Sequence, residues 1–271
     1  MNKEAPIGIF DSGIGGLTVA REVAKILPNE QIIYFGDTAH FPYGDKAASS
    51  IVHYSTLITK FLLSKNCKAI VIACNTASAV ASKPLNRILP ENFPILNVID
   101  PVANHIAIKN ANEKIGIIAT KGTIGSRIYP KSIKNINKSI DVASLATPLL
   151  APMIEEGFFN NTISRTIIAE YLNKKNIKDV EVLILGCTHY PLIENEVKEF
   201  YANNNRKVKV INSARVVASE LKKVLEEQKL LSDKRSKNHN FYVSDYTKSF
   251  EKSTKFFFGD ELALDKMDLW K

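Results

Sequence analysis

The segment Ala69-Ile70-Val71-Ile72-Ala73-Cys74-Asn75-Thr76 runs from five apolar residues to a cysteine and two polar residues. A similar segment, Val182-Leu183-Ile184-Leu185-Gly186-Cys187-Thr188, stands 113 positions further along the chain. Gly8-Ile9-Phe10-Asp11-Ser12 and Gly116-Ile117-Ile118-Ala119-Thr120 form a second similar pair, at an offset of 108. Chance could explain either pair alone, but a shared cysteine and two nearly equal offsets indicate an internal duplication. The chain is therefore predicted to contain two related halves.

Around these segments, apolar runs of strand length alternate with longer segments whose apolar residues recur at helical spacing. Most of the runs are apolar throughout, which favours strands buried on both faces of a parallel sheet. The prediction is an α/β fold with two similar doubly wound parallel-sheet domains, related by the apparent duplication. The predicted strands are 6–10, 31–35, 69–73, 95–99, 115–119, 180–185 and 208–211, and the predicted helices are 17–27, 54–64, 163–173 and 214–227.

Length and composition agree with a globular protein of about two domains of ~100–200 residues each. The 271 residues are 45% apolar and 24% charged, which argues against a disordered or fibrous chain. No apolar run approaches the ~18–20 residues of a membrane helix, and the N-terminal segment is too polar for a signal peptide. Three cysteines, an odd number, favour a reducing compartment. We therefore expect a cytoplasmic protein without a membrane partner.

The net charge of +8 raises the question of a nucleic-acid partner. The basic residues are mostly lysines spread along the chain. The longest basic cluster, Lys234-Arg235-Ser236-Lys237, contains no aromatic residue and accompanies no known DNA-binding or RNA-binding motif. We interpret this cluster as a solvated loop and expect no nucleic-acid partner.

The three cysteines differ in their surroundings. Cys67 has no chemical neighbours and is expected to be a buried apolar residue. Cys74 and Cys187 each follow an apolar run and precede polar residues, where a helix N-terminus can lower the pKa of a thiol. His189 stands two residues beyond Cys187. Ligands of open parallel sheets bind beyond the carboxyl ends of the strands. Two thiols at equivalent strand ends therefore favour a functional role.

Several thiol chemistries fit these residues poorly. No Cys-x-x-Cys motif is present, and the arginine that a thiol phosphatase needs six residues on is replaced by Val80 and Ile193. A zinc site made from Cys74, Cys187 and His189 lacks a clear fourth ligand. A single nucleophile with His189 as its base would suit a hydrolase or acyl transferase, but leaves one cysteine unused. Two thiols on opposite sides of a substrate fit inversion at carbon, in which one removes a proton and the other returns one.

A glycine-rich turn, Asp11-Ser12-Gly13-Ile14-Gly15-Gly16-Leu17-Thr18, connects the first predicted strand to a helix. Such a turn exposes backbone N–H groups and suits a carboxylate or small anion. It departs from the dinucleotide fingerprint, which needs glycine or alanine where Thr18 stands, and it has no P-loop lysine. An anion site and a plain tight turn both remain open for this segment.

In combination these motifs resemble the cofactor-independent glutamate racemases of the aspartate/glutamate racemase superfamily. The resemblance covers essentially the whole chain and rests on residues 8–17, 34–39, 42–44, 73–77 and 185–191. It implies interconversion of L-glutamate and D-glutamate without cofactor or metal, with D-glutamate supplied to peptidoglycan synthesis. It also implies a homodimer in the cytoplasm of a bacterium.

The resemblance assigns roles to individual residues. Cys74 and Cys187 are implied to be the acid/base residues, Cys74 for the α-proton of the D-enantiomer and Cys187 for that of the L-enantiomer. Asp11, and Glu156 together with His189, are implied to tune the two thiols, and the choice between Glu156 and the adjoining Glu155 stays open. The implied substrate contacts are Asp11, Ser12, Tyr43, Gly44, Asn75, Thr76, Thr120, Thr123, Thr188 and His189.

The resemblance also implies a first domain of residues 1–97 plus 211–271, a second domain of residues 98–210, and an active site in the cleft between them. Two other functions stay open. The first is a racemase for another amino acid such as aspartate, because one methylene group changes little in a binding site. The second is a binding protein that senses an acidic amino acid.

Overall fold

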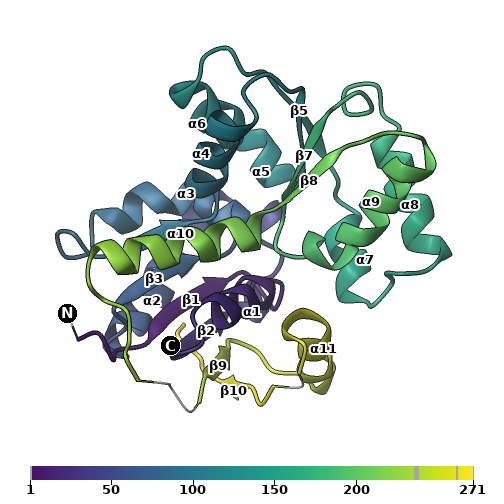
Figure 1. Ribbon diagram of the computed structural model, residues 1–271. Coiled ribbons are helices and arrows are strands. Elements are labelled where there is room, and N and C mark those ends of the chain that lie inside the picture. The colour runs from purple at the N-terminus through teal and green to yellow at the C-terminus, as the bar shows by residue number, and fades with distance from the viewer. Residues whose placement is uncertain (1, 235–237, 261, 271) are drawn as a thin grey trace. The chain divides into compact units, whose positions relative to one another are not determined.

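The computed structural model describes residues 2–234, 238–260 and 262–270, and the chain divides into two compact units (Figure 1). The first unit comprises Met1–Val98 and Ala214–Lys271, and the second comprises Ile99–Ser213. The expected domain boundaries were 97/98 and 210/211, and the boundaries between the two units lie at 98/99 and 213/214. Of the basic cluster interpreted as a solvated loop, residues 235–237 lie outside the described part of the chain.

The first unit contains a six-stranded sheet whose strands all pair in parallel, in the order β10-β9-β2-β1-β3-β4. Its central strands are buried along their whole length. This burial explains their almost continuous apolar sequences. The strands are β1 (Ile7–Asp11), β2 (Ile32–Gly36), β3 (Ala69–Ile72), β4 (Ile95–Asn97), β9 (Asn240–Val243) and β10 (Asp265–Lys266), and the helices are α1 (Leu17–Ile26), α2 (Ala48–Ser64), α3 (Asn75–Asn86), α10 (Ser213–Glu227) and α11 (Lys248–Phe258).

The second unit contains a four-stranded parallel sheet in the order β6-β5-β7-β8. Strands β5 and β7 in its centre are completely buried, whereas the edge strand β6 is half-buried. The strands are β5 (Ile115–Ala119), β6 (Val142–Ala146), β7 (Val182–Gly186) and β8 (Lys209–Asn212), and the helices are α4 (Ile99–Lys109), α5 (Lys121–Ser126), α6 (Ile128–Ile136), α7 (Leu150–Glu155), α8 (Thr162–Leu172) and α9 (Glu194–Asn203).

The two sheets repeat one arrangement of four strands. The order β2-β1-β3-β4 in the first unit corresponds to β6-β5-β7-β8 in the second. Ile7 pairs with Ala69 in the first sheet, and Ile115 pairs with Val182 in the second. These are the positions that the sequence offsets of 108 and 113 relate, so the similar segments have the same register as well as the same order.

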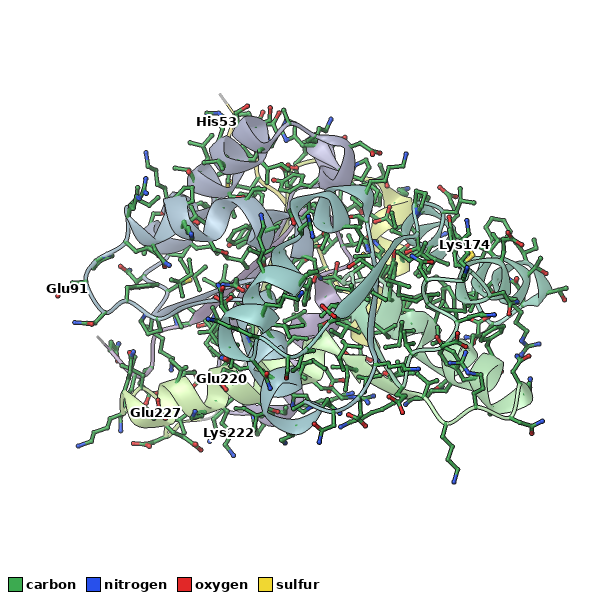
Figure 2. All side chains as sticks on the ribbon, turned by 90° about the horizontal axis from the view of Figure 1, so that it is seen from above. His53, Glu91, Lys174, Glu220, Lys222 and Glu227 are labelled. Carbon is green, nitrogen blue, oxygen red and sulfur yellow. The ribbon has the colours of Figure 1, made fainter. Side chains whose placement is uncertain are left out.

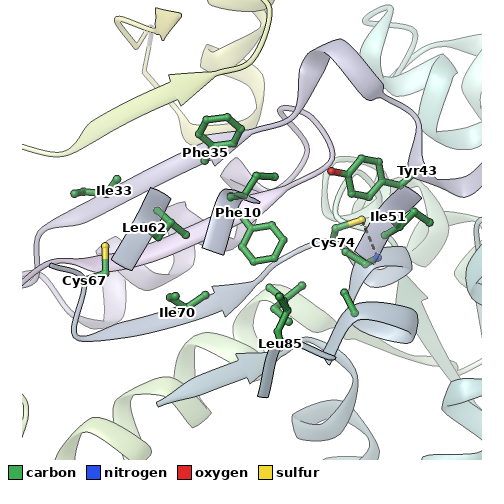
Figure 3. Packing of buried hydrophobic residues seen from close by; sticks show 14 residues of the cluster. Phe10, Ile33, Phe35, Tyr43, Ile51, Leu62, Cys67, Ile70, Cys74 and Leu85 are labelled. Carbon is green, nitrogen blue, oxygen red and sulfur yellow. Dashed lines mark hydrogen bonds between the residues drawn. The ribbon is translucent and has the colours of Figure 1, made fainter. Parts of the chain in front are cut away.

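Apolar side chains of β1, β2 and β3 form a cluster with helices α2 and α3 on one face of the first sheet (Figure 3). Phe10, Phe35 and Ile70 belong to this cluster, and so do Tyr43 and Cys74 at its far end. Hydrophobic burial of this kind is the main favourable contribution to folding. The cluster therefore connects the core of the first unit directly to two predicted functional residues, Tyr43 and Cys74.

Helix α10 has the amphipathic pattern predicted for residues 214–227. Val217, Leu221 and Leu225 recur at intervals of four and are fully buried. Lys222 and Glu227 project from the opposite side (Figure 2). Within the part of the chain that the structure describes, no helix combines the length and apolarity of a membrane span.

The structure differs from the predicted elements where local sequence is ambiguous. The run 95–99 ends its strand at Asn97, and Ile99 already begins α4. Strand β6 was not predicted, because its sequence Val-Ala-Ser-Leu-Ala is small, partly polar and half-buried at a sheet edge. A helix was expected directly after Cys74, and α3 begins there at Asn75, although its residues are mostly small and polar and Pro84 lies inside it.

Candidate active site

Cys74 lies two residues beyond strand β3 and forms the N-cap of α3. Its Sγ accepts a hydrogen bond from the backbone N–H of Ala77 at 3.4 Å (Figure 3) and lies 3.5 Å from Ser12 Oγ. The side chain is buried, with 5% exposure. A helix N-terminus favours a negative charge, so this position is suited to a thiolate.

Asp11 is the last residue of β1 and is fully buried. Its Oδ2 accepts a hydrogen bond from Gly16 N–H at 2.8 Å. A Cβ atom at position 16 would lie 2.5 Å from Asp11 Cβ, so only glycine fits there. The N–H groups of residues 17–20 donate to carbonyl groups of residues 14–16. The N–H groups of residues 16–20 are therefore used within the turn itself. The glycine-rich segment is a tight turn closed by the hydrogen bond from Gly16 N–H to Asp11.

Tyr43 belongs to the segment that follows the cis Phe41–Pro42 bond, and it is almost completely buried. Its hydroxyl group donates to Asp37 Oδ2 at 2.6 Å. Burial, together with the charges of Asp37, Cys74 and Asp11, holds the pKa of Tyr43 well above its ordinary value. Tyr43 is therefore a neutral hydrogen-bonding group close to Cys74.

The other predicted residues of the first unit are placed at the same edge of its sheet. Ser12 follows β1, and the buried Asn75 and Thr76 form the first turn of α3. Gly44 is in the short helical segment Tyr43–Asp45. These residues, with Asp11, Tyr43 and Cys74, form the candidate site of the first unit.

Cys187 directly follows β7 in the second unit and is buried, with 7% exposure. His189 Nδ1 lies 3.5 Å from its Sγ, and His189 Nε2 lies 2.8 Å from Glu155 Oε1. Burial by itself lowers the pKa of His189, but the hydrogen bonds and charges of Cys187 and Glu155 outweigh it and hold this pKa well above its ordinary value. The geometry therefore suits an imidazolium between a thiolate and a carboxylate.

The carboxylate beside His189 belongs to Glu155 and not to Glu156, between which the sequence left the choice open. Helix α7 ends at Glu155, whose side chain is 15% exposed, whereas Glu156 is the exposed C-cap residue. Successive residues of a helix point about 100° apart, so only one of two adjacent glutamates can face His189. Sequence alone could not decide between them, because both follow the same apolar stretch.

Two buried tyrosines near Cys187 were not singled out from the sequence. The Tyr190 hydroxyl lies 2.6 Å from Thr147 Oγ1, and burial and the charge of Cys187 raise its pKa well above the ordinary value. Burial and Cys187 likewise raise the pKa of Tyr129, despite a hydrogen bond with Ser213 that lowers it. Tyr190 belongs to the sequence motif around Cys187, and this position was the signal that could have identified it as a residue of the site. Tyr129 had no such signal, because α6 brings it from a distant segment.

Thr120 and Thr123 lie at the start of α5, beside the end of β5. Thr120 Oγ1 accepts from Thr123 N–H at 3.3 Å, and Thr123 is buried. Ala119 pairs with Gly186 across the sheet, so Thr120 and Cys187 follow paired residues. Thr188 is buried next to Cys187. The site of the second unit thus consists of these three threonines with Cys187 and His189.

Among residues 2–234, 238–260 and 262–270, no group of three or more His, Cys, Asp or Glu side chains is arranged to hold a metal ion. Each of the two cysteines, one in each unit, has buried titratable side chains near it: Tyr43 near Cys74, and His189 and Tyr190 near Cys187. Parallel α/β units that place a buried thiol and proton-handling partners at the carboxyl edge of the sheet define an acid/base enzyme.

Comparison with known proteins identifies the kind of enzyme. The Asp/Glu/Hydantoin racemase family matches residues 16–221, and the chain belongs to this family of isomerases. It is similar to glutamate racemase from Geobacter metallireducens, with 40% identity over 258 residues, 95% of this chain and 94% of the relative.

Solved structures give the same relationship. Glutamate racemase from Francisella tularensis in complex with D-glutamate is 38% identical, with a TM-score of 0.90 over 99% of both chains. An aspartate racemase from Picrophilus torridus is 19% identical, with a TM-score of 0.57 over 93% of this chain and 99% of the other, and so shares the fold alone.

Proposed function

We propose that the protein is a glutamate racemase that interconverts L-glutamate and D-glutamate with two thiols and no cofactor. The observation that carries this proposal is the pair of buried cysteines at register-equivalent strand ends, Cys74 beyond β3 and Cys187 beyond β7. The likeness to glutamate racemases over almost the whole chain supports glutamate as the substrate.

In the proposed reaction the Cys74 thiolate removes the α-proton of D-glutamate, and the C–H electron pair remains on the α-carbon. The Cys187 thiol then donates its proton to the opposite face of that carbon, which gives L-glutamate and leaves a Cys187 thiolate. The reverse reaction exchanges the two roles. The mechanism requires both thiols to reach one substrate, and it consumes no oxidant, metal or cofactor.

Each thiol has a partner that suits this role. The N–H of Ala77 and the N-terminus of α3 stabilise negative charge on Cys74. Protonated His189 stabilises the Cys187 thiolate, and Glu155 holds His189 through Nε2. Glu155 therefore takes the supporting role that was expected of Glu156, while Asp11 is proposed to tune Cys74.

The substrate contacts proposed are neutral donors, which suit a zwitterion with two carboxylates. They are Ser12, Tyr43, Gly44, Asn75, Thr76, Thr120, Thr123 and Thr188. Asp11 and His189 are also proposed to contact the substrate, through its amino group or its carboxylates. We further propose that the protein is a cytoplasmic homodimer that supplies D-glutamate to peptidoglycan synthesis.

Circular dichroism of L-glutamate mixed with the purified, chelator-dialysed protein tests the function. The signal should decay to zero, whereas L-aspartate at the same concentration should keep most of its signal. Faster decay with L-aspartate would establish the aspartate racemase instead. Glutamate binding without any decay, retained after both cysteines are replaced, would establish a binding protein.

A further inference from the structure

Asp37 is a fully buried carboxylate immediately beyond β2, and its two oxygens accept from three side chains. The Tyr43 hydroxyl donates to Oδ2 at 2.6 Å, and Ser244 Oγ donates to Oδ1 at 2.7 Å. His40 Nδ1 lies 2.9 Å from Oδ1 and 3.0 Å from Oδ2. This contact suits the His40 tautomer that can donate from Nδ1 to the carboxylate. Asp37 thus joins the segment that contains His40 and Tyr43 to Ser244, which follows β9.

The other face of this network is aromatic. The His40 ring stacks on Tyr54 of α2, with centroids 3.9 Å apart and planes 17° apart. Trp270 meets the His40 ring edge-on, with centroids 4.6 Å apart, and contacts Tyr54 at 5.2 Å. The three rings therefore form one cluster between the Asp37 network and the C-terminal segment that follows β10.

Trp270 is held in this cluster by its ring contacts. Its indole nitrogen is buried and has no hydrogen-bond partner among the described residues. Leaving a buried donor without a partner is unfavourable, so the packing of the ring determines where the indole lies. Trp270 also packs, with Met267 and Leu269, against the hydrophobic cluster that contains Tyr43 and Cys74.

The segment between β2 and α2 depends on such contacts. Its only regular structure is two short helical turns, Thr38–His40 and Tyr43–Asp45, and most of its residues other than Tyr43 are partly or fully exposed. Few backbone hydrogen bonds hold it, so its side-chain contacts to Asp37 and the aromatic cluster determine where Tyr43 and Gly44 lie.

We infer that His40 and Trp270 are positioning residues for substrate binding, which act through Asp37 on Tyr43 and Gly44. Trp270 of the C-terminal segment then supports the substrate site of the first unit without contacting the substrate. This inference rests on the proposed function, because it uses the contact of Tyr43 and Gly44 with glutamate.

Steady-state racemisation of glutamate tests the inference with three variants. Trp270→Ala should raise KM about tenfold, since two aromatic contacts are lost, and change kcat less than about twofold. Trp270→Phe should restore most of the affinity. Met267→Ala is the matched control, because it removes packing from the same segment without a ring contact to His40. An unchanged KM in Trp270→Ala, or an equal rise in Met267→Ala, would overturn the inference.

A double-mutant cycle checks that Trp270 acts through Tyr43. In a Tyr43→Phe background, Trp270→Ala should raise KM less than about twofold, because the connection to Asp37 is already broken. Independent tenfold effects that multiply in the double variant would show that the two residues act separately, and would refute the proposed route.

Fluorescence gives a second readout, since Trp270 is the only tryptophan of the chain. Titration with D-glutamate should change the emission of the parent protein with a midpoint close to KM, and the change should shrink in Tyr43→Phe. Saturating D-glutamate with no change of emission would contradict the inference. If the parent protein binds D-glutamate but does not racemise it, the proposed function is wrong. The fluorescence titration then still tests whether Trp270 responds to binding through Tyr43.

Discussion

At the scale of single residues, the two cysteines have different proton partners. Cys74 contacts a hydroxyl group and a helix N-terminus, whereas Cys187 contacts a histidine held by a carboxylate. Neither residue resembles Cys67, which has no such partner in the described part of the chain and whose pKa burial raises to about 12. The chemical roles of the three cysteines therefore follow from what surrounds each one.

Removing either functional thiol should stop racemisation in both directions. In Cys187→Ala and Cys74→Ala, kcat should fall by about a thousandfold or more, because one of the two proton transfers has lost its group. In deuterated water, Cys187→Ala should keep at most a slow exchange of the α-proton of D-glutamate, and Cys74→Ala that of L-glutamate. Nuclear magnetic resonance with chiral chromatography measures both. A Cys187→Ala variant that racemises glutamate near the parent rate would contradict the two-thiol mechanism.

The adjacent glutamates of α7 form a matched pair for testing the support of His189. Glu155→Gln should lower kcat roughly tenfold to a hundredfold, since it removes a charged hydrogen-bond partner of Nε2. Glu156→Gln should stay close to the parent, because this side chain is exposed. Equal losses in the two variants would show that the contact with Glu155 has no special part in turnover.

The raised pKa of His189 also predicts a pH dependence of stability. Because the pKa of His189 in the folded protein lies above its ordinary value near 6.5, the protonated ring stabilises the fold fully below about pH 6.5. This contribution is lost as the pH rises through the pKa of the folded state. The Tm of the parent should therefore exceed that of His189→Asn most at pH 6 and least at pH 10. A difference that grows with pH would contradict this assignment.

At the scale of elements, Cys74 has a structural task besides its chemical one, because its Sγ caps α3. Serine is a good N-cap residue and alanine is not, so Cys74→Ser should unfold with a free energy about 1 kcal/mol higher than Cys74→Ala. Both variants should be inactive as racemases. Urea unfolding followed by circular dichroism measures the difference, and equal stabilities would mean that the cap contributes nothing.

The elements also show where local patterns suffice. Strands β1, β2, β3, β5 and β7 are fully buried and, apart from Asp11 at the end of β1, carry no polar side chain, and their sequences predicted each end within two residues. Strands β6 and β9 at and near sheet edges carry polar residues and were not predicted. Edge strands are stabilised by pairing with a neighbour, which a local pattern does not contain.

At the scale of the whole molecule, the first unit joins the two ends of the chain around a buried ion pair. Lys68 Nζ lies 2.6 Å from Glu30 Oε2, and both side chains are at most 2% exposed. Glu30 Oε1 accepts from the backbone N–H of Ser232 at 2.8 Å, and Ser232 Oγ donates to Glu4 at the same distance. Ser232, which lies a few residues beyond α10, is thereby attached to the N-terminal segment that begins the unit.

Breaking this ion pair on one side should be strongly destabilising. Glu30→Ala leaves a buried lysine without its partner, and should lower the free energy of unfolding by about 3–5 kcal/mol. Replacing both partners, as in Glu30→Leu with Lys68→Met, should be milder because no uncompensated charge remains. Urea denaturation of the parent, Glu30→Ala and the double variant measures the three free energies of unfolding. A Glu30→Ala variant that is more stable than the double variant would contradict this prediction.

The sequence by itself determined the α/β class, the duplicated arrangement of strands and the two cysteines at their ends. Burial of a strand on both faces and repetition of a motif leave a local signature, and the two similar pairs, at residues 69–76 and 182–188 and at residues 8–12 and 116–120, were sufficient together. Only the tertiary structure decided the partners: Glu155 rather than Glu156 at His189, Asp37 at Tyr43, and Trp270 at His40. These contacts join segments from 6 to 230 residues apart, as at Tyr43 and Trp270. They depend on the pairing of strand ends and the rotation of helices, and no local stretch of sequence records either.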